Sequence, residues 1–138
     1  MIIINKRNLF FLISVWLLST LLSAQNVTIS TPQTQLLLSV PNGGTPEQLY
    51  YGSRTSDADI RSICETACRR NAYPVYGMGY PCETALSVRH ADGNLTLQMV
   101  VIGVKETRLT KENATLTVIE LKDKVYPFFV NICYKAWQ

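Results

Sequence analysis

Residues 71–94 read NAYPVYGMGYPCETALSVRHADGN, a stretch that joins dense turn signals to an alternating segment. Its first part, residues 73–81, holds two prolines and two glycines among three tyrosines. Proline removes a backbone donor and restricts the residue before it, and glycine supplies conformations that other residues avoid. Residues 73–81 are therefore predicted to form an aromatic-lined loop rather than a helix.

The second part of this stretch predicts a β-hairpin. Thr84–His90 alternates well enough for a half-buried strand, and Asp92-Gly93 offers the positive φ values of a tight turn. A second strand is predicted over Leu95–Val104.

The flanking sequence continues the pattern of strands and turns. Short apolar or alternating runs separated by turn residues predict strands at Val27–Ile29, Leu36–Val40, Gln48–Gly52, Ala114–Leu121 and Tyr126–Ala136, with Lys122-Asp123-Lys124 as the last turn. About seven short strands in succession favour an all-β antiparallel β-sandwich over an alternating βαβ fold.

One segment departs from this pattern. Ser56 is a good N-cap for a helix over Asp57–Arg69, with Asp57 and Asp59 at its positive end and Arg69 and Arg70 at its negative end. Ile60, Ile63, Cys64 and Ala67 then share one face. A single short helix inserted between strands is the expectation.

Length and composition indicate one modest domain. The chain has 138 residues, of which 47% are hydrophobic and 17% charged, so it can bury a core. Lys6 and Arg7 account for two of the 13 basic residues, which leaves 11 basic against 10 acidic residues in the remainder. Nucleic acid is not an expected partner, because phosphate binding needs clustered Lys and Arg.

The N-terminus has the pattern of a secretory signal peptide. Residues 1–24 combine a basic start, an apolar run at Leu9–Leu22 and a small-residue end at Ser23-Ala24. The apolar run is shorter than the ~20 residues of a spanning helix, although a retained membrane anchor is the alternative. Cleavage near Ala24 predicts export to the periplasm or the medium, a domain at residues 25–138, and no stable membrane anchor.

An ordered set of motifs resembles the N-terminal domain of family 36 glycoside hydrolases, the retaining α-galactosidases of bacteria. The motifs are Leu49-Tyr50-Tyr51-Gly52, Tyr73-Pro74-x-Tyr76-Gly77, Ala85-Leu86 and His90-Ala91-Asp92-Gly93-Asn94. The likeness runs from about Leu36 onward. It is specific as a set and weak for any one motif.

The resemblance implies an incomplete, supersandwich-like β domain. In the family, the rest of the sandwich, a catalytic (β/α)₈ barrel and a C-terminal β domain follow. Tyr134–Gln138 ends within an apolar strand pattern without turn residues, so the chain is expected to be a fragment. Its implied partners are the barrel of the parent enzyme and neighbouring subunits, the substrate of the intact enzyme is an α-galactoside, and no cofactor is expected.

No residue of this chain is predicted to be catalytic. Retaining hydrolysis needs two carboxylates ~5 Å apart, which in the family belong to the barrel. Asp57 and Asp59 form the one close aspartate pair, but residues two apart on a helix point in different directions. His90, the one histidine, is a candidate general base, and the hairpin likeness favours a structural role for it.

Tyrosines supply the candidate binding residues. Tyr50, Tyr51, Tyr73, Tyr76 and Tyr80 could stack on sugar rings, or they could serve as core and domain-interface residues, which is the preferred interpretation. In multimeric relatives, loops of this domain form part of a neighbouring subunit's active-site rim. That comparison makes Tyr50–Arg54, including Arg54, and Tyr73–Tyr80 the candidate rim loops.

Four cysteines follow the predicted signal peptide. Cys64 and Cys68 lie one helical turn apart, a poor geometry for bonding each other, so a bridge from either would reach Cys82 or Cys133. Buried thiols or one disulfide are expected. A zinc site is disfavoured, because a lone C-x₃-C is a weak pattern.

Two hypotheses about function remain at this stage. The first is the non-catalytic N-terminal portion of an exported α-galactosidase, inactive alone. The second is a free-standing secreted β-sandwich that binds carbohydrate or protein through its tyrosine loops.

Overall fold

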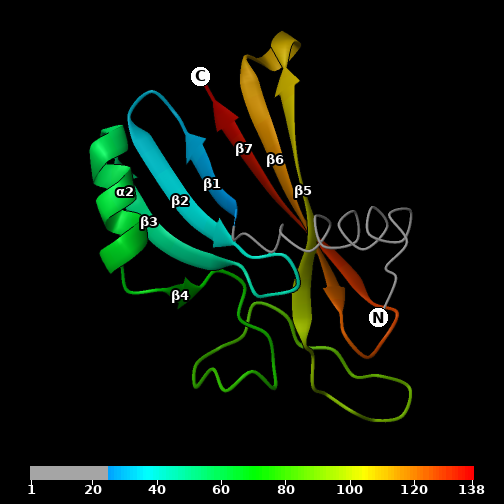
Figure 1. Ribbon diagram of the computed structural model, residues 1–138. Helices are drawn as coiled ribbons and strands as arrows, with labels where there is room; N and C mark the ends of the chain where they lie inside the picture. Colours follow the sequence, from blue (N-terminus) through cyan, green and yellow to red (C-terminus); the bar gives the residue numbers. More distant parts are fainter. Residues whose placement is uncertain (1–24) are drawn as a thin grey trace, which may run out of the picture.

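The computed structural model describes residues 25–138 as two antiparallel sheets with one α-helix and a short 3-10 helix at Thr110–Glu112 (Figure 1). The first sheet has the order β1 (Gln25–Ser30), β2 (Thr34–Val40), β3 (Glu47–Ser53) and β4 (Arg70–Asn71). The second has the order β5 (Met99–Leu109), β6 (Ala114–Asp123) and β7 (Phe129–Trp137). The prediction of an all-β sandwich with one inserted helix is confirmed. The predicted signal peptide lies outside the described residues.

The hydrophobic core lies between the two sheets. The first sheet contributes Val27, Leu38 and Val40, the second contributes Met99, Val101, Ile119 and Leu121, and the connecting loop adds Val75 and Leu97. The alternation of side chains along a strand explains why these strand residues form the core, because every second residue faces the same side of the sheet. Both halves of the chain therefore depend on one core.

Strand β2 is covered on both faces, which explains its continuous apolar run. Leu36 and Leu38 belong to the core between the sheets, whereas Leu37 lies on the opposite face of the strand and is 1% exposed. Figure 1 shows α2 (Asp57–Thr66) beside that side of the first sheet. A run without alternation is typical of a strand buried on both sides.

Helix α2 begins as predicted and ends earlier. Ser56 caps it, accepting from the Asp59 N–H, and the Asp59 carboxylate accepts in return from the Ser56 N–H, which completes a capping box. The expected continuation to Arg69 is wrong, because Ala67 adopts an extended conformation with ψ of 142°. Arg69 and Arg70 therefore do not cap the helix.

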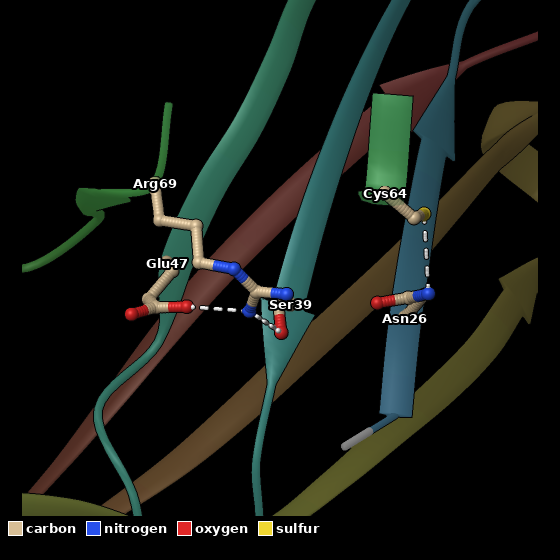
Figure 2. A network of polar contacts seen from close by, with 5 residues as sticks. All are labelled: Asn26, Ser39, Glu47, Cys64 and Arg69. Atoms are coloured by element: carbon tan, nitrogen blue, oxygen red, sulfur yellow. Dashed lines mark hydrogen bonds and ion pairs between the residues drawn. The ribbon is translucent and has the colours of Figure 1, made fainter. Parts of the chain in front are cut away.

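Side-chain contacts link the helix region to the first sheet (Figure 2). Arg69 donates to the Glu47 carboxylate at 2.9 Å and to the Ser39 hydroxyl at 3.4 Å. Asn26 Nδ2 donates to Cys64 Sγ at 3.2 Å, which joins β1 to the C-terminal half of α2. Half-buried Ile60, Ile63, Cys64 and Ala67 form the predicted common face.

The predicted hairpin is the largest local error. Thr84–His90 does not form a strand, because its backbone has no neighbouring strand and pairs only in one bridge between Leu86 and Val75. The expected alternation of burial is nevertheless present, with Leu86 and Val88 half-buried and Ser87 and Arg89 exposed. The tight turn is formed, since Gly93 has φ of 86° and its N–H donates to the His90 carbonyl.

The three strands of the second sheet also have bounds that differ from the prediction. The strand expected over Leu95–Val104 begins at Met99 and continues to Leu109. The strand expected from Ala114 to Leu121 continues to Asp123, and the last strand begins at Phe129 instead of Tyr126. The turn between them is thus shifted toward the C-terminus.

Candidate functional site

The loop between β4 and β5 is folded around two buried side chains. Val75 and Leu97 are both 0% exposed and belong to the inter-sheet core. The Leu97 N–H donates to the Tyr76 carbonyl at 3.0 Å, and the Ala85 N–H donates to the Pro74 carbonyl at 2.8 Å. These bonds fix the tyrosine-bearing segment to the sandwich.

A cluster of polar and aromatic side chains joins this loop to the turn between β6 and β7. The His90 and Tyr126 rings are stacked, with centroids 3.5 Å apart and planes 9° from parallel. Tyr126 donates its hydroxyl to Asp92 Oδ2 at 2.6 Å and accepts from Asn94 Nδ2 at 3.0 Å. We call His90, Asp92, Asn94, Asp123 and Tyr126 the loop clasp.

Asp123 forms the buried part of the clasp. Its side chain is 1% exposed and accepts from the backbone N–H of Val125 and Tyr126 at 2.8 Å and from that of Gln98 at 2.6 Å. Burial alone raises the pKa of this carboxyl, but the three hydrogen bonds stabilise the carboxylate more, and the pKa is lowered. Asp123 is therefore a carboxylate that holds two loops together.

Two further groups of the clasp, Asp92 and Tyr126, also have shifted pKa values. The hydrogen bond from Tyr126 lowers the pKa of Asp92, and the same bond raises the pKa of Tyr126. His90 has a buried Nε2 that lacks a hydrogen-bond partner. His90 is half-buried, with its Nε2 enclosed and its ring stacked on Tyr126. This supports the structural role predicted for this histidine, since a general base needs access to a substrate proton.

The sequence motifs included three of the five residues of this cluster. The hairpin motif included His90, Asp92 and Asn94, but Asp123 and Tyr126 were assigned only to a turn and a strand. One signal in the sequence could have indicated the role of Asp123. An aspartate at the start of a turn commonly accepts hydrogen bonds from the N–H groups of the residues two and three positions after it. The contact with residues 90–94 required the tertiary structure.

The candidate tyrosines fall into two groups. Tyr50 and Tyr51 lie on β3, with Arg54 just after its end, whereas Tyr73, Tyr76 and Tyr80 follow β4, whose Asn71 pairs with Glu47 at the start of β3. Seven residues separate Glu47 from Arg54, about 23 Å of extended strand. The structure thus does not gather all six side chains at one place.

Exposure separates the tyrosines further. Tyr51 is 67% exposed, Tyr76 is 49% and Tyr80 is 46%, so these rings are available to a partner. Tyr73 is half-buried and packs against the core, and Tyr50 donates its hydroxyl to the Ser53 carbonyl at 2.9 Å. Tyr73 therefore fits the core part of the preferred interpretation, and a domain-interface role for the exposed tyrosines stays a prediction.

Two shallow pockets lie near these tyrosines, one beside Tyr50 and Tyr51 and one beside the loop residues Gly77 and Met78. One of about 340 Å³ lies between β3 and the end of α2, and its lining includes Tyr50, Tyr51, Ile63, Cys68 and Arg70. The other, of about 260 Å³, includes Gly44, Gly77, Met78, Gln98 and Lys124. Each combines apolar surface with one cationic side chain.

A third pocket opens between the sheets at the end away from the loop clasp. It has about 270 Å³ and is lined mainly by polar side chains, among them Thr28, Glu106, Arg108, Thr115 and Thr117. The inward-facing residues of β5 change from Met99 and Val101 to Glu106 and Arg108 along the strand. The core therefore occupies only the end of the sandwich nearer the clasp.

All four cysteines are free thiols in this structure. Cys64 is half-buried, whereas Cys68, Cys82 and Cys133 are exposed. Buried thiols or one disulfide were expected. Only Cys64 is partly buried, and no disulfide is formed in this structure. Disulfide formation after export stays a prediction.

The structure of residues 25–138 can also be searched for a metal site and for a membrane-spanning helix. In this part of the chain, no group of three His, Cys, Asp or Glu side chains is placed to hold a metal ion. The helix found there is too short to cross a bilayer. Asp57 and Asp59 both lie in the first turn of α2, where Asp59 serves the capping box.

The fold and the loop clasp define a class of protein: a two-sheet antiparallel β-sandwich domain whose long loop is pinned to the turn between its last two strands. Residues 44–138 match the glycosyl hydrolase family 36 N-terminal domain. The chain belongs to this family. No curated protein sequence matches the chain.

Solved structures of α-galactosidases share the fold. The α-galactosidase from Lactobacillus brevis is 14% identical, with a TM-score of 0.67 over 81% of this chain and 19% of its own. The family 36 α-galactosidase AgaA from Geobacillus stearothermophilus, in complex with 1-deoxygalactonojirimycin, is 14% identical, with a TM-score of 0.70 over 83% and 20%. The galactosidase domain of AgaSK is 18% identical, with a TM-score of 0.63 over 80% and 20%. The chain thus spans about a fifth of the length of each.

Proposed function

We propose that this chain is the N-terminal, non-catalytic portion of an exported α-galactosidase. The observation that carries the proposal is the family match over residues 44–138, together with the likeness to α-galactosidases of which the chain spans about a fifth. The intact enzyme would hydrolyse terminal α-D-galactosides. This domain would serve domain packing, oligomerisation and the active-site rim.

The state of the two carboxylates in the loop clasp argues against a general-acid role for them. Retaining hydrolysis needs a general acid whose pKa is raised, so that it holds a proton near neutral pH. Asp92 and Asp123 have lowered pKa values and are engaged as hydrogen-bond acceptors in the loop clasp. They hold loops in place instead of donating a proton.

The exposed loop tip supports the rim role. Tyr76, Met78 and Tyr80 are 49%, 39% and 46% exposed, although the segment that bears them is fixed by Val75 and Leu97. Aromatic side chains on a rigid base suit contact with the apolar face of a pyranose ring. Tyr51 and Arg54 form a second, separate candidate contact at the other end of β3.

Reassembly tests the proposal. The purified chain should not turn over a chromogenic α-galactoside. It should restore activity when co-expressed with a family 36 α-galactosidase from which the matching N-terminal fifth has been deleted. Turnover by the chain alone, or failure to associate with the truncated enzyme while remaining folded, would contradict it. N-terminal sequencing of the exported protein would test cleavage near Ala24.

The exposed tyrosines also favour one alternative, a free-standing secreted module that binds carbohydrate or protein. In that case the chain alone should bind galactosides, and Tyr76→Ala with Tyr80→Ala should abolish binding. Tyr51→Ala is a matched control, because this exposed tyrosine lies on β3 away from the loop tip. A chain that associates with the truncated enzyme and does not bind free galactosides would exclude the module.

A further inference from the structure

One turn of the first sheet is hydrogen-bonded to a strand of the second. Residues 41–44 form the turn between β2 and β3, and the Gly43 N–H donates to the Val101 carbonyl of β5 at 2.8 Å. The Val101 N–H donates in return to the Gly44 carbonyl, also at 2.8 Å. Figure 1 shows this turn beside β5. Val101 is 3% exposed and belongs to the core between the sheets, so the turn is held against a buried part of the second sheet.

The same turn contains a chemically labile pair of residues. Asn42-Gly43 is the one Asn-Gly pair in the sequence, and every other asparagine precedes a residue with a side chain. Glycine has no Cβ, so its backbone nitrogen is open to a reaction with the preceding side chain. Asn42 and Gly43 are both exposed, so water and hydroxide ions reach them.

Ring closure between the two residues would release the side-chain amide. Base removes the Gly43 N–H proton and the nitrogen attacks Asn42 Cγ. A new C–N bond replaces the Cγ–Nδ2 bond, and Nδ2 leaves as ammonia after it takes up a proton from water. Water then opens the succinimide ring at either carbonyl and leaves aspartate or isoaspartate. The net reaction exchanges NH₂ for OH and consumes only water.

The docked turn opposes this reaction in two ways. The proton that Gly43 must lose is the one that its N–H donates to Val101. The Gly44 N–H donates to the Pro41 carbonyl at 3.0 Å, and φ is positive at Gly43 but not at Asn42, which defines a type II turn. In such a turn ψ of Asn42 is about +120°, which turns its Cβ away from the Gly43 nitrogen that a five-membered ring must include.

We propose that Asn42 is a deamidation site that reacts only after the turn at residues 41–44 leaves β5. The reaction makes this release permanent, because isoaspartate adds one CH₂ to the backbone. Gly43 N–H and Gly44 C=O then no longer both reach Val101. A chain that has opened at this contact would therefore carry a lasting chemical mark.

Peptide mapping by mass spectrometry measures the reaction at each asparagine in mildly alkaline buffer. In urea, Asn42 should react about tenfold or more faster than Asn71, the matched internal control, because Asn71 precedes Ala72, whose Cβ hinders ring closure. In the folded protein, Asn42 should react about tenfold or more slowly than in urea, because the two hydrogen bonds to Val101 must open first. Asn42→Gln should remove the signal, since its longer side chain would need a larger ring.

Gly44→Ala tests whether the docked turn controls the rate. A Cβ at Gly44 would lie 2.7 Å from Pro41 Cγ, so the turn must shift, while Asn42 and Gly43 keep their chemistry. Deamidation should accelerate several-fold in the folded variant and stay unchanged in urea. Gly93→Ala is the matched control, because Gly93 has φ of +86° in another turn and a Cβ there would meet nothing within 4 Å. It should leave both rates unchanged, with circular dichroism as the check on folding.

Three results would overturn the inference: equal rates in the folded and the unfolded chain, equal rates at Asn42 and Asn71 in urea, or an unchanged rate in folded Gly44→Ala. If Gly44→Ala does not fold, the ratio of the wild-type rates decides. All these measurements use the chain alone. Their failure would leave its association with the truncated α-galactosidase, and so the proposed function, unaffected.

Discussion

At the scale of single residues, Gly77 is constrained twice. Its φ is +93°, a region that L side chains rarely adopt, and a Cβ there would overlap Thr96 Cγ2 and lie 3.1 Å from Thr96 Cα. The tyrosine loop therefore passes residue 96 at a distance that only glycine permits. The sequence indicated glycine in a loop, but the close approach to Thr96 depends on the fold.

Gly77→Ala should destabilise the protein by about 2–4 kcal/mol, because a left-handed conformation costs roughly 1–2 kcal/mol and the contact with Thr96 adds strain. Gly79→Ala is the matched control, since Gly79 has φ of +73° but a Cβ added there would meet nothing within 4 Å. It should cost only about 1–2 kcal/mol. Urea denaturation gives both values, and equal losses would show that the contact is unimportant.

At the scale of elements, pairing partners decide what local patterns become. Thr84–His90 has the alternation of a strand and shows alternating burial, but it lacks a neighbouring strand along its length. Alternation reports which side is buried, whereas a β-strand also requires backbone partners. Ser56 and Asp59 needed only each other, so the start of the helix could be predicted correctly.

The turn between β6 and β7 depends on Asp123. Because the pKa of this carboxyl is lowered in the folded protein, its contribution to stability is present above the unfolded pKa of about 3.9. That contribution is lost as pH falls through the lower folded pKa. Asp123→Asn removes the negative charge and places the amide NH₂, a donor, against one of the backbone N–H donors. The free energy of unfolding at pH 7 should fall by about 2–4 kcal/mol.

The difference in unfolding free energy between the wild-type protein and Asp123→Asn should shrink on going from pH 7 to pH 3. Chemical denaturation at several pH values measures it. Asp57→Asn is the control, because this exposed helix residue makes no comparable set of hydrogen bonds. A difference that stays constant with pH would contradict the role assigned to the Asp123 carboxylate.

At the scale of the whole molecule, one core joins the two sheets. Ile119 is 0% exposed and belongs to the cluster that also contains Leu38 of the first sheet and Leu97 of the loop. The sheets should therefore unfold together. The other end of the sandwich holds a polar pocket in place of core residues. The cooperative unfolding of the two sheets therefore depends on the core residues near the loop clasp.

Ile119→Ala should cost about 2–5 kcal/mol, through lost burial and the cavity that remains. Amide hydrogen exchange should then accelerate in β2 as well as in β6, because both strands depend on that core. Ile102→Ala is the control, since Ile102 is 49% exposed on β5, and should change stability by about 0.5 kcal/mol or less. Faster exchange in the second sheet alone would show that the sheets are independent.

The sequence by itself determined the fold class, the helix cap, the tight turn at Gly93 and the motifs that resemble family 36, because each depends on neighbouring residues or on the period of a strand. Only the tertiary structure decided that Asp123 and Tyr126 hold the loop of His90 and that the candidate tyrosines lie in two places. These features arise from contacts between segments distant in the chain, and a local pattern does not specify which segments meet.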